Sequence, residues 1–439
     1  MRILLTGMSG FIGTHVSTAL LAEGFQLVCT VRHPPAQADP RLRLIKADFA
    51  RDTGKHAWLP RLDGIDVVIN CVGIIAEHGA QTFAALHTQA PCALFAACAE
   101  REVRLVIQLS ALGADEGAVS PYHRSKKTAD DFLASLPLPS VIVQPSLVYG
   151  DEGASARLLR MLASLPVYPR FGTAQQAVQP VHVGDLTDVI VALVRGAGAA
   201  GGRTTRRLPV VGPEPLPFVA YLAALRAAMG LGRLRVLPLP RWLMPAVLPP
   251  AKLLGFAMPD RDTLRMLDRG NVADARPMQR LLGRAPRPVA RFIDHPRAAA
   301  VQARLDWLLP LLRLSIAVVW IVTAIVSAGV YPVADSYRLL ERSGMPASLA
   351  PLLLAGACVL DLLFGLATLM LRPPWRRWLW PAQAVLIGFY TVLIALRMPE
   401  FLWHPYGPLT KNLPMLAVLW LLYEMEEGKE KQEEKPWNT

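Results

Sequence analysis

Three side chains between residues 110 and 126 have types and a spacing that suit proton transfer to or from a hydroxyl or carbonyl group. Tyr122 and Lys126 are four residues apart in a helical pattern, which puts both on one face of the helix. A phenol titrates near pH ~10, and a neighbouring ammonium stabilises the phenolate and lowers that pKa. Ser110 ends an apolar, strand-like run and would hydrogen-bond the substrate oxygen. We therefore predict that Tyr122 is the catalytic acid–base, with Lys126 and Ser110 as its catalytic partners.

A glycine-rich turn near the N-terminus has the spacing of a phosphate-binding loop. Its glycines are three residues apart, directly after a predicted strand and at the start of a predicted helix. Glycines let the backbone approach a pyrophosphate, and the helix N-terminus offers it N–H groups and a positive dipole end. The residues of this turn that we expect at a dinucleotide are Thr6, Gly7, Gly10, Phe11, Ile12 and Gly13.

The end of the second predicted strand indicates which dinucleotide is preferred. An acidic residue there would bind the ribose of NAD, but the chain reads Thr30-Val31-Arg32. Arg32 can pair with a 2′-phosphate, and no carboxylate is present to repel that phosphate. We therefore expect NADP(H) in preference to NAD(H). Asp48, just after the third predicted strand, is a candidate contact to the adenine, or else a residue that only holds its turn.

These residues need a scaffold, and the first 235 residues predict one. Short apolar runs alternate with helical patterns of ten or more residues, which is typical of a Rossmann-type, doubly wound parallel α/β sheet. The predicted strands are 3–6, 27–31, 43–46, 67–70, 104–109, 141–144 and 208–211. The predicted helices include 11–23, 82–101, 122–136 and 218–229.

The motifs together resemble the extended and atypical short-chain dehydrogenases over about the first half of the chain. Further stretches that fit are Asn70-Cys71-Val72-Gly73, in the place of the family's Asn-Ala-Gly, and residues 144–150 and 180–185. The run 110–115 is most similar to the branch that includes the nucleotide-binding accessory subunit of respiratory complex I. The resemblance implies that Asn70, Val72, Gly73 and Lys126 also contact the cofactor, and that a nicotinamide gives or takes a hydride.

The last third of the chain is apolar enough to lie in a membrane. Hydrophobic residues make up 53% of the chain and charged residues only 18%, and the apolar excess follows residue 305. Four hydrophobic stretches occur at 308–330, 349–371, 378–396 and 413–423. The first three approach the length that crosses a bilayer, and the fourth is short. Three arginines between the second and third stretches predict a cytoplasmic turn, with both termini cytoplasmic and the chain integral to the inner membrane.

The C-terminal stretches also resemble a DoxX-like membrane domain, on the residues His404-Pro405-Tyr406-Gly407-Pro408, with Pro332 and Asp335 before them. Such a resemblance implies a fold and no reaction. Asp361 lies midway along the second stretch, where an ionised carboxylate is costly, so it is a candidate intramembrane functional residue. The alternatives for Asp361 are a pairing with Arg313 or a protonated side chain. We expect His404 to be an interfacial loop residue.

A basic segment lies between the predicted α/β region and the apolar C-terminal region. Residues 236–304 contain prolines, an apolar edge at Trp242, and eight arginines between positions 261 and 291. These arginines are Arg261, Arg265, Arg269, Arg276, Arg280, Arg284, Arg287 and Arg291. Together with the formal net charge of +12, they favour a linker on anionic lipid headgroups. No nucleic-acid partner is expected, because no zinc spacing or RNA-binding motif accompanies the charge.

The expected organisation has four parts. Residues 1–235 form an NADP(H)-binding domain, 236–304 a membrane-surface linker, 305–426 a DoxX-like four-helix transmembrane domain, and 427–439 a charged tail. The five cysteines have no Cys-x-x-Cys spacing, so we expect reduced thiols and no metal. The first apolar stretch is too short for a signal peptide, so the N-terminal domain is expected to start in the cytoplasm.

The favoured function is NADP(H)-dependent interconversion of a carbonyl and a hydroxyl on an apolar, lipid- or quinone-like small molecule. A tether to the bilayer would concentrate the enzyme near such a substrate. One alternative is a non-catalytic, NADPH-binding structural or sensing subunit, against which the Ser110, Tyr122 and Lys126 set weighs. Another is a sugar-nucleotide epimerase or dehydratase, which would share the extended family's fold.

Overall fold

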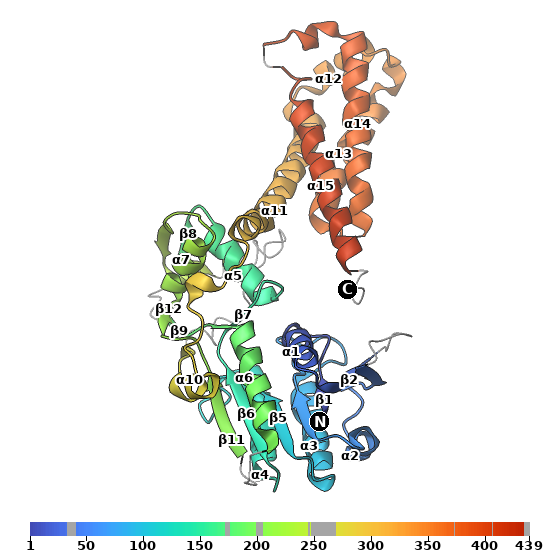
Figure 1. The fold of residues 1–439 in the computed structure, drawn as a ribbon. Helices are drawn as coiled ribbons and strands as arrows, with labels where there is room; N and C mark the ends of the chain where they lie inside the picture. The colour runs from blue at the N-terminus through green and yellow to red at the C-terminus, as the bar shows by residue number, and fades with distance from the viewer. Residues whose placement is uncertain are drawn as a thin grey trace. The chain divides into compact units, whose positions relative to one another are not determined.

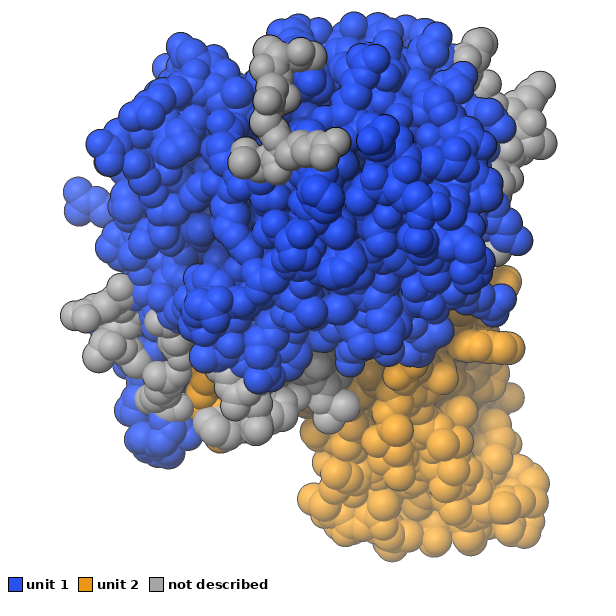
Figure 2. All heavy atoms as spheres, turned by 90° about the horizontal axis from the view of Figure 1, so that it is seen from below, with its two compact units in different colours: residues 1–243, 259–303 blue, residues 244–258, 304–439 orange. Residues whose placement is uncertain are grey.

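The computed structural model describes residues 1–32, 41–171, 176–198, 205–244, 246, 269–372, 374–405 and 407–433. Arg261, Arg265, Tyr406 and the tail residues 434–439, named above, lie outside these ranges. The chain divides into two compact units, residues 1–243 with 259–303 and residues 244–258 with 304–439, which Figure 2 colours separately. Each unit is described by itself.

The first unit is built on a seven-stranded sheet with the order β11-β6-β5-β4-β1-β2-β3 (Figure 1). Every neighbouring pair in this sheet is parallel. The strands are β1 (Arg2–Thr6), β2 (Gln26–Val31), β3 (Leu42–Lys46), β4 (Val67–Asn70), β5 (Leu105–Leu109), β6 (Ser140–Pro145) and β11 (Thr205–Val210). The order reverses beside β1, where open α/β sheets bind their ligands, and the predicted Rossmann-type fold is confirmed.

Alternate side chains of the strands point to opposite faces of the sheet and build two separate cores. Ile3 and Leu5 of β1 belong to one core, and Leu4 between them belongs to the other. Helices α1 (Phe11–Ala22), α6 (Val183–Arg195) and α10 (Arg276–Leu282) cover the first face. Helices α2 (Lys55–Trp58), α3 (Ala90–Glu100) and α4 (Pro121–Ser135) cover the second, and a π-helical turn, Ala84–Gln89, leads into α3.

A smaller subdomain of the first unit packs around its own core. Helices α5 (Ala154–Ser164) and α7 (Phe218–Ala228) meet there with the segment around Phe292. Three short strand pairs surround them: β7 (Val148–Tyr149) with β10 (Val181–His182), β9 (Ala177–Val178) with β12 (Leu216–Pro217), and β8 (Tyr168–Phe171) with β13 (Val236–Leu239). Helices α5 and α6 were not among those named from the sequence.

The structure corrects the expected linker over residues 269–303, which fold into the first unit. Met278 of α10 is fully buried in the core on one face of the sheet, and Phe292 is 1% exposed in the subdomain core. Arg284 lies 2.6 Å from carboxylate oxygens of both Asp185 and Asp188. Apolar burial and these ion pairs hold this part of the segment in the first unit. Trp242 is 75% exposed.

The second unit is helical. It contains α11 (Pro296–Ile325), whose first residues belong to the first unit, α12 (Val333–Arg342), α13 (Ala350–Met370), α14 (Trp375–Arg397) and α15 (Asn412–Glu433). Three helices are long and apolar enough to cross a membrane: the one at residues 296–330, which includes α11, the one at 347–370, which includes α13, and α14. The fourth hydrophobic stretch forms α15, which is not among these three in the described part of the chain.

Candidate functional site

In the glycine turn between β1 and α1, backbone atoms approach so closely that a side chain would clash with them. Gly7 adopts a φ of 75°, and a Cβ there would lie 2.8 Å from the backbone of Cys71 and Val72. A Cβ on Gly13 would lie 2.0 Å from the Gly7 carbonyl oxygen. Gly10 caps α1 without a side-chain hydrogen bond, so the first N–H groups of the helix have no cap. This cradle fits a pyrophosphate group.

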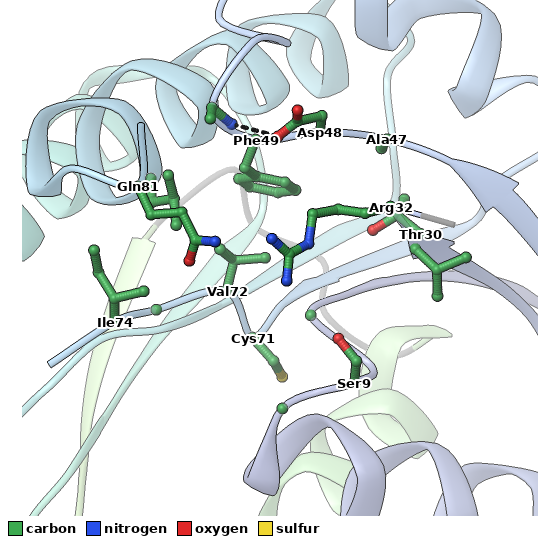
Figure 3. Close-up of a pocket in the computed structure, with 16 residues that line it drawn as sticks. Ser9, Thr30, Arg32, Ala47, Asp48, Phe49, Cys71, Val72, Ile74 and Gln81 are labelled. Atoms are coloured by element: carbon green, nitrogen blue, oxygen red, sulfur yellow. Dashed lines mark hydrogen bonds between the residues drawn. The ribbon is translucent and has the colours of Figure 1, made fainter. Parts of the chain in front are cut away.

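A pocket opens beside this turn, along the carboxyl ends of β1, β2, β3 and β4. Its lining includes Gly7, Gly10, Arg32, Asp48, Val72 and Gly73 from the residues expected at the cofactor. Figure 3 shows the Arg32 side chain extending into this pocket. Asp48 accepts a hydrogen bond of 3.0 Å from the Ala50 N–H, so it also holds its own turn.

The other residues expected at the cofactor do not line the pocket. Thr6 and Asn70 are buried below it, where Thr6 Oγ1 donates to Asn70 Oδ1 (2.6 Å) and Asn70 Nδ2 donates to Gln108 (2.7 Å). This chain of hydrogen bonds crosses three neighbouring strands and fixes their ends. Phe11 packs toward Gly150, and Ile12 packs on the sheet core, so only their backbone N–H groups are candidates for the phosphates.

Tyr122 and Lys126 lie on α4 as the spacing predicted. Ser120 caps this helix by accepting from the His123 N–H, and Pro121 occupies its first turn. Lys126 is 4% exposed, and its Nζ donates to the carbonyl oxygens of Leu109 (3.0 Å) and Val72 (3.2 Å). A Cβ on Gly73 would lie 3.1 Å from the same Nζ. The ammonium is therefore held at the carboxyl ends of β4 and β5, beside the pocket-lining residues Val72 and Gly73.

Ser110 follows the end of β5 as predicted, but its hydroxyl is bound inside the protein. It is 4% exposed, and its Oγ donates to Asp130 Oδ2. Asp130 follows Tyr122 by two helical turns, about 12 Å along the axis. In the described residues no hydrogen bond joins Ser110 to Tyr122. The geometry therefore does not support Ser110 as a donor to the substrate oxygen, because its hydroxyl is already bound inside the protein.

Asp130 adds a buried charge that sequence reasoning missed. It is fully buried, and its Oδ1 has no hydrogen-bond partner among the described residues. Burial raises the pKa of Asp130 to about 6, against the opposing effects of Ser110 and Lys126. Its spacing was a usable signal, since residues 122, 126 and 130 share one helix face. The sequence alone did not show how α4 packs against the sheet, and this packing is what brings Ser110 against the face that carries Asp130.

The pKa values of Tyr122 and Lys126 depend on burial and on the charge of Asp130. Burial lowers the pKa of Lys126 to about 8, and the Asp130 charge opposes that shift. Burial, together with the Asp130 charge, raises the pKa of Tyr122 to about 12, whereas the sequence predicted that Lys126 would lower it. Tyr122 is thus a protonated phenol at neutral pH in this structure, which suits a proton donor.

The Tyr122 ring sits in an aromatic cluster on α4 and the π-helical turn. Its centroid lies 5.4 Å from the ring of His87 and 6.2 Å from that of Phe83. His87 Nε2 accepts from the Ile74 N–H (2.9 Å), and its Nδ1 lies 3.0 Å from Ser125 Oγ. Burial lowers the pKa of His87 to about 2, so this imidazole is neutral and holds the ring in place.

Comparison with known proteins agrees with this architecture. Residues 3–204 match the model of the NAD dependent epimerase/dehydratase family, and residues 317–420 match the DoxX-like family. A ceramide reductase from Caulobacter vibrioides is 28% identical over 196 residues, 44% of this chain and 61% of that protein. Subunit 9 of the mitochondrial NADH dehydrogenase (ubiquinone) 1 alpha subcomplex from Dictyostelium discoideum is 26% identical over 203 residues, 44% of this chain and 56% of that protein.

Solved structures share the fold of the first unit. A nucleoside-diphosphate-sugar epimerase from Staphylococcus aureus superposes with a TM-score of 0.52 at 15% identity, covering 66% of this chain and 99% of that one. UDP-glucuronic acid 4-epimerase from Bacillus cereus, in complex with UDP-glucuronic acid and NAD, gives a TM-score of 0.50 at 19% identity, covering 70% and 100%.

Proposed function

We propose that this chain, which joins a domain of the NAD-dependent epimerase/dehydratase family to a DoxX-like domain, is an NADP(H)-dependent oxidoreductase acting on a lipid-like molecule. The observation that supports the proposal is the Tyr122–Lys126 pair on one helix, whose lysine donates to the carbonyl oxygen of the pocket-lining residue Val72. Family membership supports an NAD(P) cofactor, and the preference for NADP(H) rests on Arg32.

The residues divide the work of reducing a carbonyl. When bound, the nicotinamide supplies a hydride to the carbonyl carbon. The Tyr122 hydroxyl donates its proton to the carbonyl oxygen, so that an alcohol and a phenolate result. Lys126 donates two of its N–H groups to the carbonyl oxygens of Val72 and Leu109, which leaves the third N–H group for the site. Its positive charge stabilises the phenolate.

The substrate class is inferred from two observations. The ceramide reductase similar to the first unit has a lipid substrate by its name, and the second unit has three helices apolar enough to cross a membrane. A nucleotide-binding subunit without turnover is the second candidate. It is favoured by the engagement of Ser110 with Asp130 and by the similarity to a subunit of NADH dehydrogenase.

Isotope transfer distinguishes these two candidates. The full-length protein, in vesicles of its native membrane lipids, is given NADPH that carries deuterium at the transferable position, and the lipids are analysed by mass spectrometry. A reductase places one deuterium in a lipid alcohol, and omission of the protein abolishes the product. If NADPH binds tightly and no lipid gains deuterium, the binding subunit is the correct assignment.

Replacing Arg32 by alanine should weaken NADPH far more than NADH. The guanidinium reaches into the pocket, and a charge-assisted contact to a 2′-phosphate contributes about 1.5–3 kcal/mol, or about 10–100-fold in affinity. Fluorescence titration with both cofactors measures this. The matched control is Arg43→Ala, an exposed arginine of β3 that does not line the pocket. Equal losses for both cofactors would contradict the NADP(H) assignment.

Replacing Asp130 by asparagine should move the alkaline limb of the pH–rate profile to lower pH. The amide still accepts from Ser110 but lacks the charge that raises the pKa values of both Lys126 and Tyr122. Both values therefore fall, and the protonated pair needed for reduction is lost earlier as the pH rises. Asp130→Glu should restore the wild-type limb. An unchanged limb in Asp130→Asn, measured on kcat/KM, would show that Asp130 has only a structural role.

We also propose that the α/β domain faces the cytoplasm and that anionic lipids are partners of the membrane-spanning unit. Arg372 lies between α13 and α14, and Arg376 and Arg377 lie in the first turn of α14, a charge bias that favours the cytoplasmic side. Single-cysteine reporters at positions 335, 372 and 432 test this with a membrane-impermeant reagent. We expect only 335 to label from outside; outside labelling at 372 would reverse the orientation, and at 432 would mean that α15 does not cross.

A further inference from the structure

Helix α13 carries a short polar stripe through an otherwise apolar span. Asp361 is the only charged residue among its 21 residues, and Gly365 and Thr368 follow on the same face. Gly365 brings α13 close to α11, since a Cβ there would lie 2.5 Å from Ile321 and 3.2 Å from the Ala317 carbonyl oxygen. The stripe therefore faces the interior of the second unit.

Two other buried polar side chains of this unit, Gln383 and Glu426, have partners. Gln383 of α14 accepts from Trp320 Nε1 (3.0 Å) and donates to Thr368 Oγ1 (2.8 Å). Glu426 of α15 accepts from Arg376 Nε (2.6 Å) and from Trp380 Nε1 (2.9 Å). These buried groups are satisfied inside the protein, as burial in an apolar medium requires.

Asp361 differs from them. It is 6% exposed, and its Oδ1 has no hydrogen-bond partner in the part of the chain that the structure describes. The pairing with Arg313 considered from the sequence is not seen, because Arg313 interacts instead with Arg376 and Glu426. No cationic side chain among the described residues is close enough to compensate the carboxylate.

The titratable groups around Asp361 offer no other counter-charge. Cys358, one turn earlier on α13, and Tyr390 on α14 interact with it electrostatically, and both are neutral or anionic groups. On α12, Arg338 pairs with Asp335, and Arg342 pairs with Glu400. The short turns packed against α13, Val326–Val330 and Ala347–Leu349, carry no titratable side chain.

We propose that Asp361 is a proton-binding site inside the membrane-spanning unit, a carboxylic acid that exchanges its proton with the surroundings. An ionised carboxylate without a partner is strongly disfavoured in such a place, whereas the protonated acid is neutral and can donate a hydrogen bond. The ligand is therefore a proton. This function is separate from the reaction of the first unit and gives the second unit a role beyond anchoring.

Labelling with dicyclohexylcarbodiimide, an apolar reagent selective for protonated carboxyls in apolar surroundings, tests the proposal. The acid adds its O–H across one C=N bond of the reagent, and the acyl group then migrates to nitrogen to give a stable N-acylurea. We expect the full-length protein in vesicles to acquire one adduct, mapped to Asp361 by peptide mass spectrometry. Its formation should slow as the pH is raised, because less acid is present.

Matched controls make the result decisive. Asp361→Asn should remove the adduct, and Asp361→Glu should retain it. Glu426 should remain unlabelled, because its carboxylate is ion-paired with Arg376. NADPH binding by each variant shows that the protein is folded, and it does not depend on turnover or on Asp361. Absence of an adduct at Asp361, or protection by Na⁺ at constant pH, would overturn the proposal, the latter by showing a metal-cation site.

Discussion

We expect turnover to fall by about 10²–10⁴-fold in Tyr122→Phe, while NADPH affinity should stay within about twofold of wild type. The phenylalanine ring keeps the contacts with Phe83 and His87, so the helix and the pocket are preserved. Only the proton donor is lost, and Lys126 stays in place because two of its N–H groups are bound to carbonyl oxygens. Steady-state kinetics with the deuterated cofactor, together with fluorescence titration, measures both quantities.

Ser110→Ala is the informative companion variant. Because the Ser110 hydroxyl donates to Asp130, its removal leaves a buried carboxylate with one hydrogen bond fewer and should act through Asp130. We expect a smaller loss of turnover than in Tyr122→Phe. If Ser110→Ala instead matched the loss in Tyr122→Phe without a change in the pH profile, Ser110 would contact the substrate directly. Unchanged turnover in Tyr122→Phe would place the acid–base at another residue.

Six of the seven strands of the sheet were predicted to within one residue at each end, and the reason is physical; the exception is β11, predicted as 208–211 and found at Thr205–Val210. Strands buried on both faces are short apolar runs that need no partner information to be recognised. The fourth strand was predicted as 67–70 and is Val67–Asn70, and the helix with Tyr122 and Lys126 was predicted as 122–136 and is Pro121–Ser135. Pro121 and Pro137 limit that helix at both ends, because proline suits the first turn and disfavours a helical residue before it.

The candidate site was predictable only where its residues are close in sequence. Tyr122 and Lys126 share a helix, so their spacing was sufficient. Ser110 lies on a different element, and its contact depends on how α4 packs against β5, which no spacing within the sequence specifies. The same limitation explains why Asp130 was missed as its partner.

The basic segment shows that a binding surface cannot be predicted from charge in the sequence alone. A row of arginines in sequence looks available to an anionic surface, but Arg284 and Arg287 are met by Asp185, about a hundred residues earlier. Asp185 is fully buried and receives the Arg287 backbone N–H as well (2.7 Å). Net charge therefore predicted a partner class, while the fold determines which arginines remain available to it.

The second large effect is expected in the glycine turn between β1 and α1, where Gly13→Ala should abolish dinucleotide binding. The added Cβ would lie 2.0 Å from the Gly7 carbonyl oxygen and 2.7 Å from the Gly7 carbonyl carbon. These are backbone atoms that cannot rotate away, so α1 must shift from the turn that positions its N–H groups. A displacement of about 1 Å at such a site costs about 10²-fold, and we expect NADPH affinity to fall by at least that factor.

Alanine substitutions at two other glycines should have smaller effects on NADPH affinity and serve as controls. A Cβ on Gly10 would meet the Gly7 carbonyl oxygen at 3.3 Å, so Gly10→Ala should weaken NADPH less than Gly13→Ala. Gly196 has nothing within 4 Å of the corresponding position, so Gly196→Ala should leave affinity unchanged. Thermal unfolding of each variant separates lost binding from lost folding. If Gly13→Ala stayed folded and bound NADPH as tightly as Gly196→Ala, the turn would not be the phosphate site, since a bound pyrophosphate requires the close approach that this substitution prevents.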